Sequence, residues 1–213
     1  MRVLSIQVGQ SRDITARGKV WPTGIFKTPV PGPVYLDVNG LTGDRQVHES
    51  VHGGDGRALY AISNQAYQFW GSLVPSGVEL NPGAFGENVT LDELDEPSIE
   101  VGDEFELGET LIQAMMPRFP CLLFASRMGM EADAQKIMRL SDHPGILFRV
   151  LRPGFIDRGQ SMVPVKRSGT GVTMTDFLKM TSDDQMSHAD FNRVKDLGLL
   201  PQKTIERLAY RLV

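Results

Sequence analysis

The sequence predicts a mainly β fold, a barrel or sandwich of short strands with a few helices. The 213 residues include 22 glycines and 13 prolines, and short apolar runs lie between these turn residues through the first two thirds of the chain. Many short strands with frequent turns are typical of all-β architectures. The pattern changes after about residue 168, so we expect a β domain over residues 1–167 and a small helical extension over residues 168–213.

Seven segments are expected to form strands, because each is a short apolar run bounded by turn residues. They are residues 2–9, 34–41, 57–63, 87–91, 104–116, 146–154 and 161–167. Within the fifth segment, FELGETLIQA is expected to be a β-hairpin, because a glycine-containing turn separates its two apolar halves.

Two helices are expected to interrupt the strands. Residues 63–74, SNQAYQFWGSLV, begin with Ser63 as an N-cap and place Trp70 on an apolar face. Residues 131–140, EADAQKIMRL, form the second, which is expected to end before Pro144 because proline disrupts a helix interior.

The extension is expected to hold two or three short helices, joined to the β domain by RSGTG. Thr173 or Thr175 can cap the first, and Ser187 can cap HADFNRVKDL. Pro201 lies in the first turn of QKTIERLAYRL. We expect these helices to pack on each other or on the β domain.

Composition excludes several classes of protein. The net charge is −4 and the pI is near 5.6, so there is no basic excess to bind a nucleic acid polymer. No apolar run is long enough to span a bilayer, so no membrane partner is expected. The start, MRVLSIQVGQ, lacks the apolar stretch of a signal peptide, and a single cysteine suits a reducing compartment. We therefore expect a cytoplasmic protein.

A glycine-rich polar segment, residues 39–60, holds Asp44, His48, His52 and Arg57. Such a loop can bring backbone N–H groups close to a ligand and form an anion-binding concavity. Its five glycines are Gly40, Gly43, Gly53, Gly54 and Gly56. On these residues alone, a surface loop with turn glycines is an equal alternative.

The two histidines of this segment are spaced four residues apart. On a helix, His48 and His52 would share one face, as zinc ligands do. Gly53 and Gly54 oppose a continuing helix, and no H-E-x-x-H pattern is present. A histidine satisfied by a hydrogen bond is the default interpretation, and a paired-histidine metal site is the minor one.

Two further segments carry polar residues that suit a ligand. Lys27 and Thr28 precede stiffening prolines and can together bind a phosphate, although an exposed lysine in a proline-rich connection is the alternative. Glu87 and Asn88 follow a glycine at the start of an expected strand, where they can serve a cleft or form a turn.

Cys121, the only cysteine, follows the segment MMPRFP and cannot form an internal disulfide. A free cysteine is usually a small buried hydrophobe, and the following LLF favours that environment. Arg118, three residues earlier, would instead favour the thiolate, which is the form that soft metals require.

Together these segments resemble the MOSC domain, named for the C-terminal region of molybdenum cofactor sulfurases. The likeness covers roughly residues 1–167 and lies in the order GIFKTPV, GLTGDRQ, VHGGDGRALYA, GAFGENVT, VGDEFELGETLIQAMMPRFPC and RVLRPGFI. The tail resembles the helical extension of a bacterial subgroup that includes reductases of N-hydroxylated bases such as hydroxylaminopurine.

The resemblance implies a MOSC-type β-barrel that holds the molybdenum cofactor, with Cys121 as the protein ligand to molybdenum. The resemblance also implies a family-level association with pyridoxal phosphate. The implied roles of the other residues are hypotheses: proton delivery by His52 or Asp44, and contacts with the pterin, its phosphate or the substrate from Lys27, Thr28, His48, Gly53, Gly54, Arg57, Glu87, Asn88 and Arg118.

The implied activity is reduction of an N–OH group by two electrons and two protons, with release of water. No flavin, haem, iron–sulfur or G-x-G-x-x-G motif is present, so an electron-donor protein is the expected partner, and a homodimer is expected from the resemblance. Three alternatives stay open: a sulfur carrier with a Cys121 persulfide, a non-catalytic cofactor-binding module, and a zinc hydrolase that uses His48 and His52.

Overall fold

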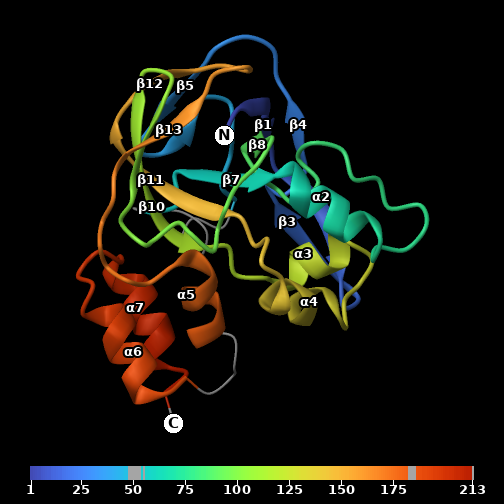
Figure 1. Ribbon diagram of the computed structural model, residues 1–213. Helices are drawn as coiled ribbons and strands as arrows, with labels where there is room; N and C mark the ends of the chain where they lie inside the picture. Colours follow the sequence, from blue (N-terminus) through green and yellow to red (C-terminus); the bar gives the residue numbers. More distant parts are fainter. Residues whose placement is uncertain (48–53, 55, 182–185, 213) are drawn as a thin grey trace.

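The mainly β fold is confirmed by the computed structural model, which describes residues 1–47, 54, 56–181 and 186–212 (Figure 1). All seven expected strand segments contain strands, and most join one eight-stranded sheet. In spatial order this sheet comprises β13 (Met162–Lys166), β9 (Glu104–Leu107), β10 (Thr110–Pro117), β11 (Ile146–Arg152), β7 (Leu59–Ser63), β8 (Val89–Leu91), β1 (Val3–Gly9) and β4 (Lys27–Pro29).

The sheet curls toward a barrel, but its ladder does not run continuously around. Its edge strands are β13 and β4. The start of β1 nevertheless reaches the start of β13 through a bridge between Arg2 and Ser161, and Met162 N donates to Met1 O at 2.8 Å. The expected barrel is therefore only loosely closed, at one short seam.

Most neighbouring strands are antiparallel, and the β9–β10 hairpin turns at Gly108 as expected. The exception is the parallel pair β7 and β8, whose connection contains α2 (Asn64–Gly71). Parallel strands need such a crossover. Ser63 caps α2 by accepting a hydrogen bond from Ala66 N, which confirms the expected start of this helix.

Two smaller sheets flank the large one. One contains β12 (Gly154–Ile156), β5 (Val34–Asp37) and β6 (Gly40–Leu41), and the other is the hairpin of β2 (Arg12–Ala16) and β3 (Lys19–Thr23). This hairpin and β4 were not expected. Most side chains of β2 and β3 are exposed, so the segment lacks the apolar run that signals a buried strand.

An aromatic cluster lies under three helices at one side of the sheet. Trp70 of α2 is fully buried and contacts Phe124 of α3 (Leu122–Arg127), with ring centroids 5.5 Å apart. Phe85 stacks on Phe124 at 6.2 Å. The second expected helix is α4 (Ala134–Leu140), whereas α3 was not expected.

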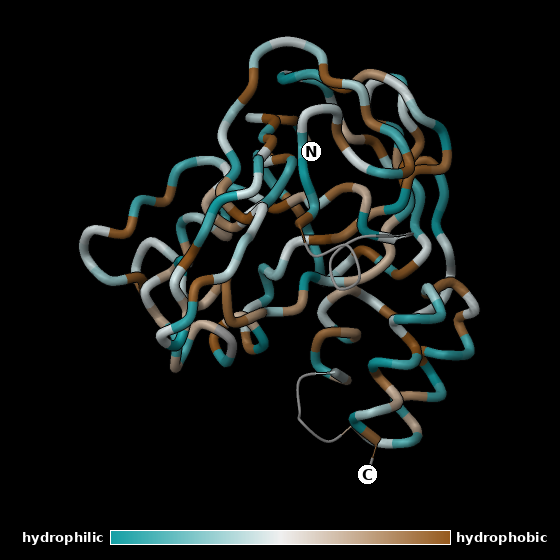
Figure 2. Tube along the Cα trace, turned by 180° about the vertical axis from the view of Figure 1, so that it is seen from behind, coloured by the Kyte–Doolittle hydropathy of each residue, from teal (hydrophilic) through white to brown (hydrophobic). Residues whose placement is uncertain are grey.

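The C-terminal residues form three helices below the sheet: α5 (Met174–Met180), α6 (His188–Lys195) and α7 (Gln202–Ala209) (Figure 1). Thr173 and Ser187 cap the first two, as expected. Hydrophobic and hydrophilic residues alternate along the helices near the C-terminus (Figure 2), the pattern of amphipathic helices. None of the helices in the described ranges is long and apolar enough to cross a membrane.

The buried faces of these helices join the main core of the sheet. Phe177 of α5 is fully buried and contacts Phe119, which follows β10, with ring centroids 5.9 Å apart. Val172 accepts a backbone hydrogen bond from Val101 at 2.9 Å. The predicted boundary near residue 168 therefore marks a change from strand to helix within one continuous core.

Candidate functional site

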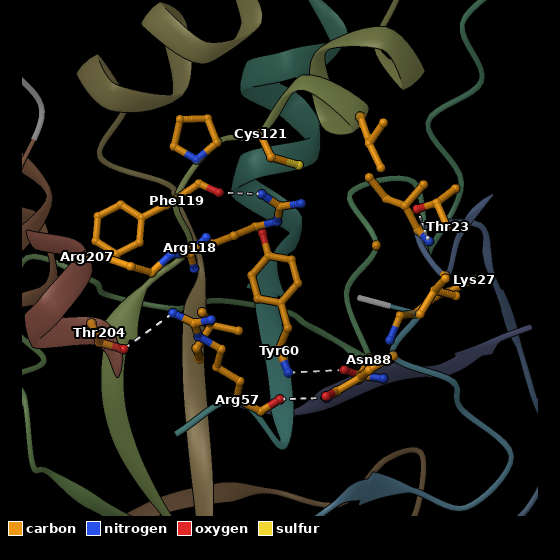
Figure 3. A pocket seen from close by; sticks show the side chains of 18 of the residues that line it. Thr23, Lys27, Arg57, Tyr60, Asn88, Arg118, Phe119, Cys121, Thr204 and Arg207 are labelled. Carbon is orange, nitrogen blue, oxygen red and sulfur yellow. Dashed lines mark hydrogen bonds between the residues drawn. The ribbon is translucent and has the colours of Figure 1, made fainter. Parts of the chain in front are cut away.

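A cavity of about 480 Å³ lies where the sheet, the segment after β10 and the C-terminal helix α7 meet (Figure 3). Its described lining residues include no carboxylate and seven basic side chains, out of 22 in the whole chain. These are Lys27, Arg45, Arg57, Arg118, Arg139, Arg207 and Arg211. An acidic protein has therefore concentrated positive charge in one cavity, which suits an anionic ligand.

Cys121 lines this cavity and is half-buried. It lies between β10 and α3, where its extended backbone makes it the residue before the first turn of the helix. Pro117 and Pro120 flank Arg118 and Phe119, so the chain leaves the sheet in a restricted conformation. In Figure 3 the sulfur of Cys121 lies beside the Arg118 guanidinium and above the Tyr60 ring.

Arg118 is held in place by a carbonyl and two aromatic rings. Its Nη1 donates to Phe119 O at 2.8 Å, and its guanidinium lies 5.5 Å from the Tyr60 ring centroid and 5.1 Å from that of Phe124. Such cation–π contacts fix a charged group beside apolar surface. Tyr60 donates to Pro144 O at 3.0 Å, and burial raises its pKa, so it stays a neutral phenol.

Lys27, Asp44 and Asn88 form a buried polar network on another side of the cavity. Lys27 Nζ lies 2.5 Å from Asp44 Oδ2, and the two side chains are only 8% and 4% exposed. Asn88 Nδ2 donates to the same oxygen at 2.8 Å, and Gly9 N donates to Asp44 Oδ1 at 2.7 Å. Lys27 and Asn88 line the cavity, whereas Asp44 lies behind them and anchors Lys27.

The charge of Lys27 is subject to opposing influences. Burial lowers the pKa of its ammonium group, and the carboxylate of Asp44 acts in the opposite direction. The nearby positive charge of Arg118 also lowers this pKa. Lys27 is therefore poised to give up a proton more readily than an exposed lysine.

Arg57 lines the cavity from the end of the glycine-rich segment. Its Nη2 donates to Thr204 Oγ1 at 3.4 Å, and its backbone carbonyl accepts from Gln46 Nε2 at 2.8 Å. The pKa of Arg57 is lowered to about 10, first by burial and then by the positive charge of Arg207. Two guanidinium groups thus approach each other at this wall of the cavity.

Several expected site residues lie elsewhere. Thr28 is exposed and does not line the cavity, because its side chain points to the opposite face of β4 from Lys27. Glu87 is fully buried and accepts from Gly83 N at 2.7 Å and Phe85 N at 3.1 Å, so it ties together its own loop. Gly54 has a φ of +92° and is outside the lining. His48, His52 and Gly53 lie outside the described residues.

The polar lining residues that the sequence did not single out include Tyr60, Arg139, Thr204, Arg207 and Arg211. Three of them come from or follow α7, which was expected to be a packing element only. One signal was available, because Arg207 and Arg211 are spaced four residues apart and would share a face if the helix expected over QKTIERLAYRL ran to its end, whereas α7 ends at Ala209.

Comparisons with known proteins identify the family. A MOSC domain matches residues 48–163, more than half of the chain. YiiM of Escherichia coli is 35% identical over 68% of this chain and 65% of its own length, and the uncharacterized YflK of Bacillus subtilis is 31% identical over 81% and 76%. A protein of Gibberella moniliformis named "Reductase" is 28% identical over 78% of this chain but only 29% of its own length.

The likeness to solved structures extends over the whole chain. The crystal structure of YiiM from Geobacillus stearothermophilus superimposes with a TM-score of 0.78 at 26% identity, covering 100% of this chain and 99% of that one. The C-terminal helices are therefore part of the shared architecture. The chain belongs to the MOSC family, and its fold is that of the YiiM structures.

The molybdenum cofactor associated with this family fits the donor set of the cavity. Within the part of the chain that the structure describes, no group of three or more His, Cys, Asp or Glu side chains could hold a bare metal ion. The cofactor brings its own sulfur ligands and an anionic phosphate, so it needs one soft protein ligand and cationic surroundings. Cys121 and the basic lining supply both.

Proposed function

We propose that this protein is a molybdenum-cofactor-dependent reductase of N-hydroxylated compounds, with base analogues such as hydroxylaminopurine as its substrate class. The observation that carries the proposal is the single thiol of Cys121 on a cavity whose described lining is basic and free of carboxylates. Membership of the MOSC family and similarity to a fungal protein named "Reductase" support it.

The reaction would convert R–NHOH, two electrons and two protons into R–NH2 and water. When bound, the cofactor supplies the electrons for cleavage of the N–O bond. Cys121 would bind its metal, and Arg118 and Arg57 would hold negative charge near it.

Lys27 is the proposed source of one proton. Its ammonium group lines the cavity, and burial lowers its pKa, so Nζ can donate to the hydroxyl oxygen that leaves as water. Asp44 would then act through Lys27, by holding Nζ in position, and not by contact with the substrate. A role for His52 in proton delivery stays a prediction, since it lies outside the described residues.

The test is the molybdenum content of protein made in a host that synthesises the cofactor, measured by elemental mass spectrometry. We expect near-stoichiometric molybdenum in the wild type and none in Cys121→Ala, with Cys121→Ser as a near-isosteric control that lacks the soft sulfur. Circular dichroism would verify that the variants fold. Loaded wild type should reduce hydroxylaminopurine with an artificial electron donor; molybdenum-free wild type from that host would refute the proposal.

A sulfur carrier is the second candidate, because the thiol of Cys121 is half-buried yet opens on a cavity. A carrier needs no molybdenum and would show a mass increment of one sulfur atom on Cys121 after incubation with a cysteine desulfurase. A non-catalytic binding module would retain molybdenum without turnover. The proposed reductase also needs an electron-donor protein. We propose that the reductase itself is a cytoplasmic homodimer.

A further inference from the structure

The last helix of the chain forms one wall of the cavity. The lining residues from this part of the chain are Thr204, Arg207 and Leu208 of α7 and Arg211, which lies two residues beyond its end. A Cβ placed on Gly56 would lie 3.3 Å from Cγ of Pro201, which starts α7. The helix therefore packs directly against the glycine-rich segment that carries Arg57.

This wall gathers positive charge against a buried surface. Thr204 is 4% exposed and accepts a hydrogen bond from Arg57, and the charge of Arg207 helps to lower the pKa of Arg57. Positive side chains gathered on one partly buried wall attract an anion, because electrostatic attraction is stronger where water is partly excluded. Such an arrangement is complementary to a ligand with negative charge.

The wall is separate from the network around Lys27. In Figure 3, Thr204 and Arg207 lie on one side of the cavity and Lys27 and Thr23 on the other, with Arg118 between them. The cavity therefore has two cationic ends, and a ligand that spans it meets basic groups at both.

We propose that α7 completes a phosphate-binding subsite, in which Arg207 and Arg211 act with Arg57 to hold the phosphate ester of a ligand. The forked N–H groups of arginine match the oxygens of a phosphate, and a hydroxyl such as that of Thr204 can add a donor. The inference rests on the proposed function for the reacting end of the ligand. It adds that the ligand carries a phosphate ester, which belongs to a nucleotide substrate or to the cofactor.

Calorimetric titration of cofactor-free protein with adenosine 5′-monophosphate and with adenosine tests the subsite directly. Wild type should bind the nucleotide at least about tenfold more tightly than the nucleoside, and Arg207→Gln and Arg211→Gln should each lose most of this preference. Lys203→Gln is the matched control, because it removes the same charge from the same helix outside the cavity lining. The nucleotide preference of Arg207→Lys should lie between those of wild type and Arg207→Gln, because lysine keeps the charge but lacks the forked N–H groups of arginine.

The molybdenum content of the same variants identifies the source of the phosphate. Loss of nucleotide preference with molybdenum retained assigns the subsite to the substrate, and loss of molybdenum as well assigns it to the cofactor. Arginine variants that match Lys203→Gln in both measurements would overturn the proposal. A wild type without molybdenum that still shows an Arg207-dependent preference would refute the proposed reductase and leave the subsite standing.

Discussion

Asp44 determines whether Lys27 keeps its charge inside the protein. The two side chains are almost fully buried, and Asp44 also accepts from Asn88 and Gly9. Removing one partner of a buried ion pair leaves an uncompensated charge, which is more costly than removing both. The positive charge of Lys27 is therefore stabilised by the carboxylate of Asp44 and not by bulk solvent.

We expect Asp44→Asn to lower the free energy of unfolding by about 3 kcal/mol, measured by urea denaturation. The double variant Asp44→Asn, Lys27→Met should lose clearly less than the sum of the two single changes, because neither charge is then left alone. Asp13→Asn, an exposed aspartate on β2, is the control and should be nearly neutral. Additive losses in the double variant would contradict the coupling.

His143 makes the stability depend on pH. The buried carboxylate of Glu96, whose Oε2 lies 3.8 Å from His143 Nδ1, is the largest influence that raises the pKa of His143, and the charge of Asp142 adds to it, against partial burial. A raised pKa in the folded state means that this stabilisation is full below the unfolded value, near 6.5, and is lost as the pH rises through the folded value.

This pH dependence is tested by measuring the midpoint of urea unfolding for wild type and for His143→Gln between about pH 6 and pH 8. Wild type should lose stability relative to the variant as the pH is raised across this range. A constant difference between the two proteins would show that His143 does not titrate with folding.

At the scale of elements, the loop from Gly83 to Glu87 is locked against β4. Gly83 has a φ of +98°, and a Cβ there would lie 2.3 Å from the backbone oxygen of Lys27. Backbone cannot move aside as a flexible side chain can, so only glycine fits. Glu87 then ties the loop from within.

Gly83→Ala is expected to destabilise the protein by at least about 3 kcal/mol, from both strain and the clash. Gly77→Ala is the matched control, because Gly77 also has a φ of +98° but no atom lies within 4 Å of the added Cβ. It should cost only about 1 kcal/mol. Equal losses in thermal unfolding would show that close packing against β4 contributes nothing.

The sequence predicted elements best where apolar periodicity and capping residues agree. β1, β7, the β9–β10 hairpin and the cap of α2 all carry such signals. The β2–β3 hairpin escaped prediction because it is stabilised by pairing and a turn at Arg17 and Gly18, both with positive φ, and not by an apolar run. α3 escaped because it is only six residues long and its N-cap residue, Cys121, makes no side-chain capping hydrogen bond.

For the whole molecule, we expect a single cooperative unfolding transition despite the change from strands to helices. Phe177 and Leu208 belong to the same core as the sheet. Both tryptophans, Trp21 and Trp70, lie before residue 168, so tryptophan fluorescence reports on the β domain and far-ultraviolet circular dichroism includes the C-terminal helices. The two thermal curves should coincide. A separate, earlier loss of helix would indicate an independent extension.

Part of the cavity lining was predicted. Cys121, Lys27, Arg57, Asn88 and Arg118 were singled out from local motifs, and the structure brings them to one cavity. The contribution of α7 was missed because it depends on a contact that spans 147 residues of sequence, from Arg57 to Thr204. Motifs report on neighbours along the chain, whereas the wall of a cavity is set by tertiary packing.

The lone thiol also gives this protein a built-in reporter. Because Cys121 is the only cysteine and opens on the cavity, a thiol-reactive dye can label the protein at one position only. A molecule whose sulfur is engaged by a ligand would resist labelling, and an empty one would react. The fraction of dye incorporated therefore counts loaded and empty molecules in a mixed sample, without any assay of turnover.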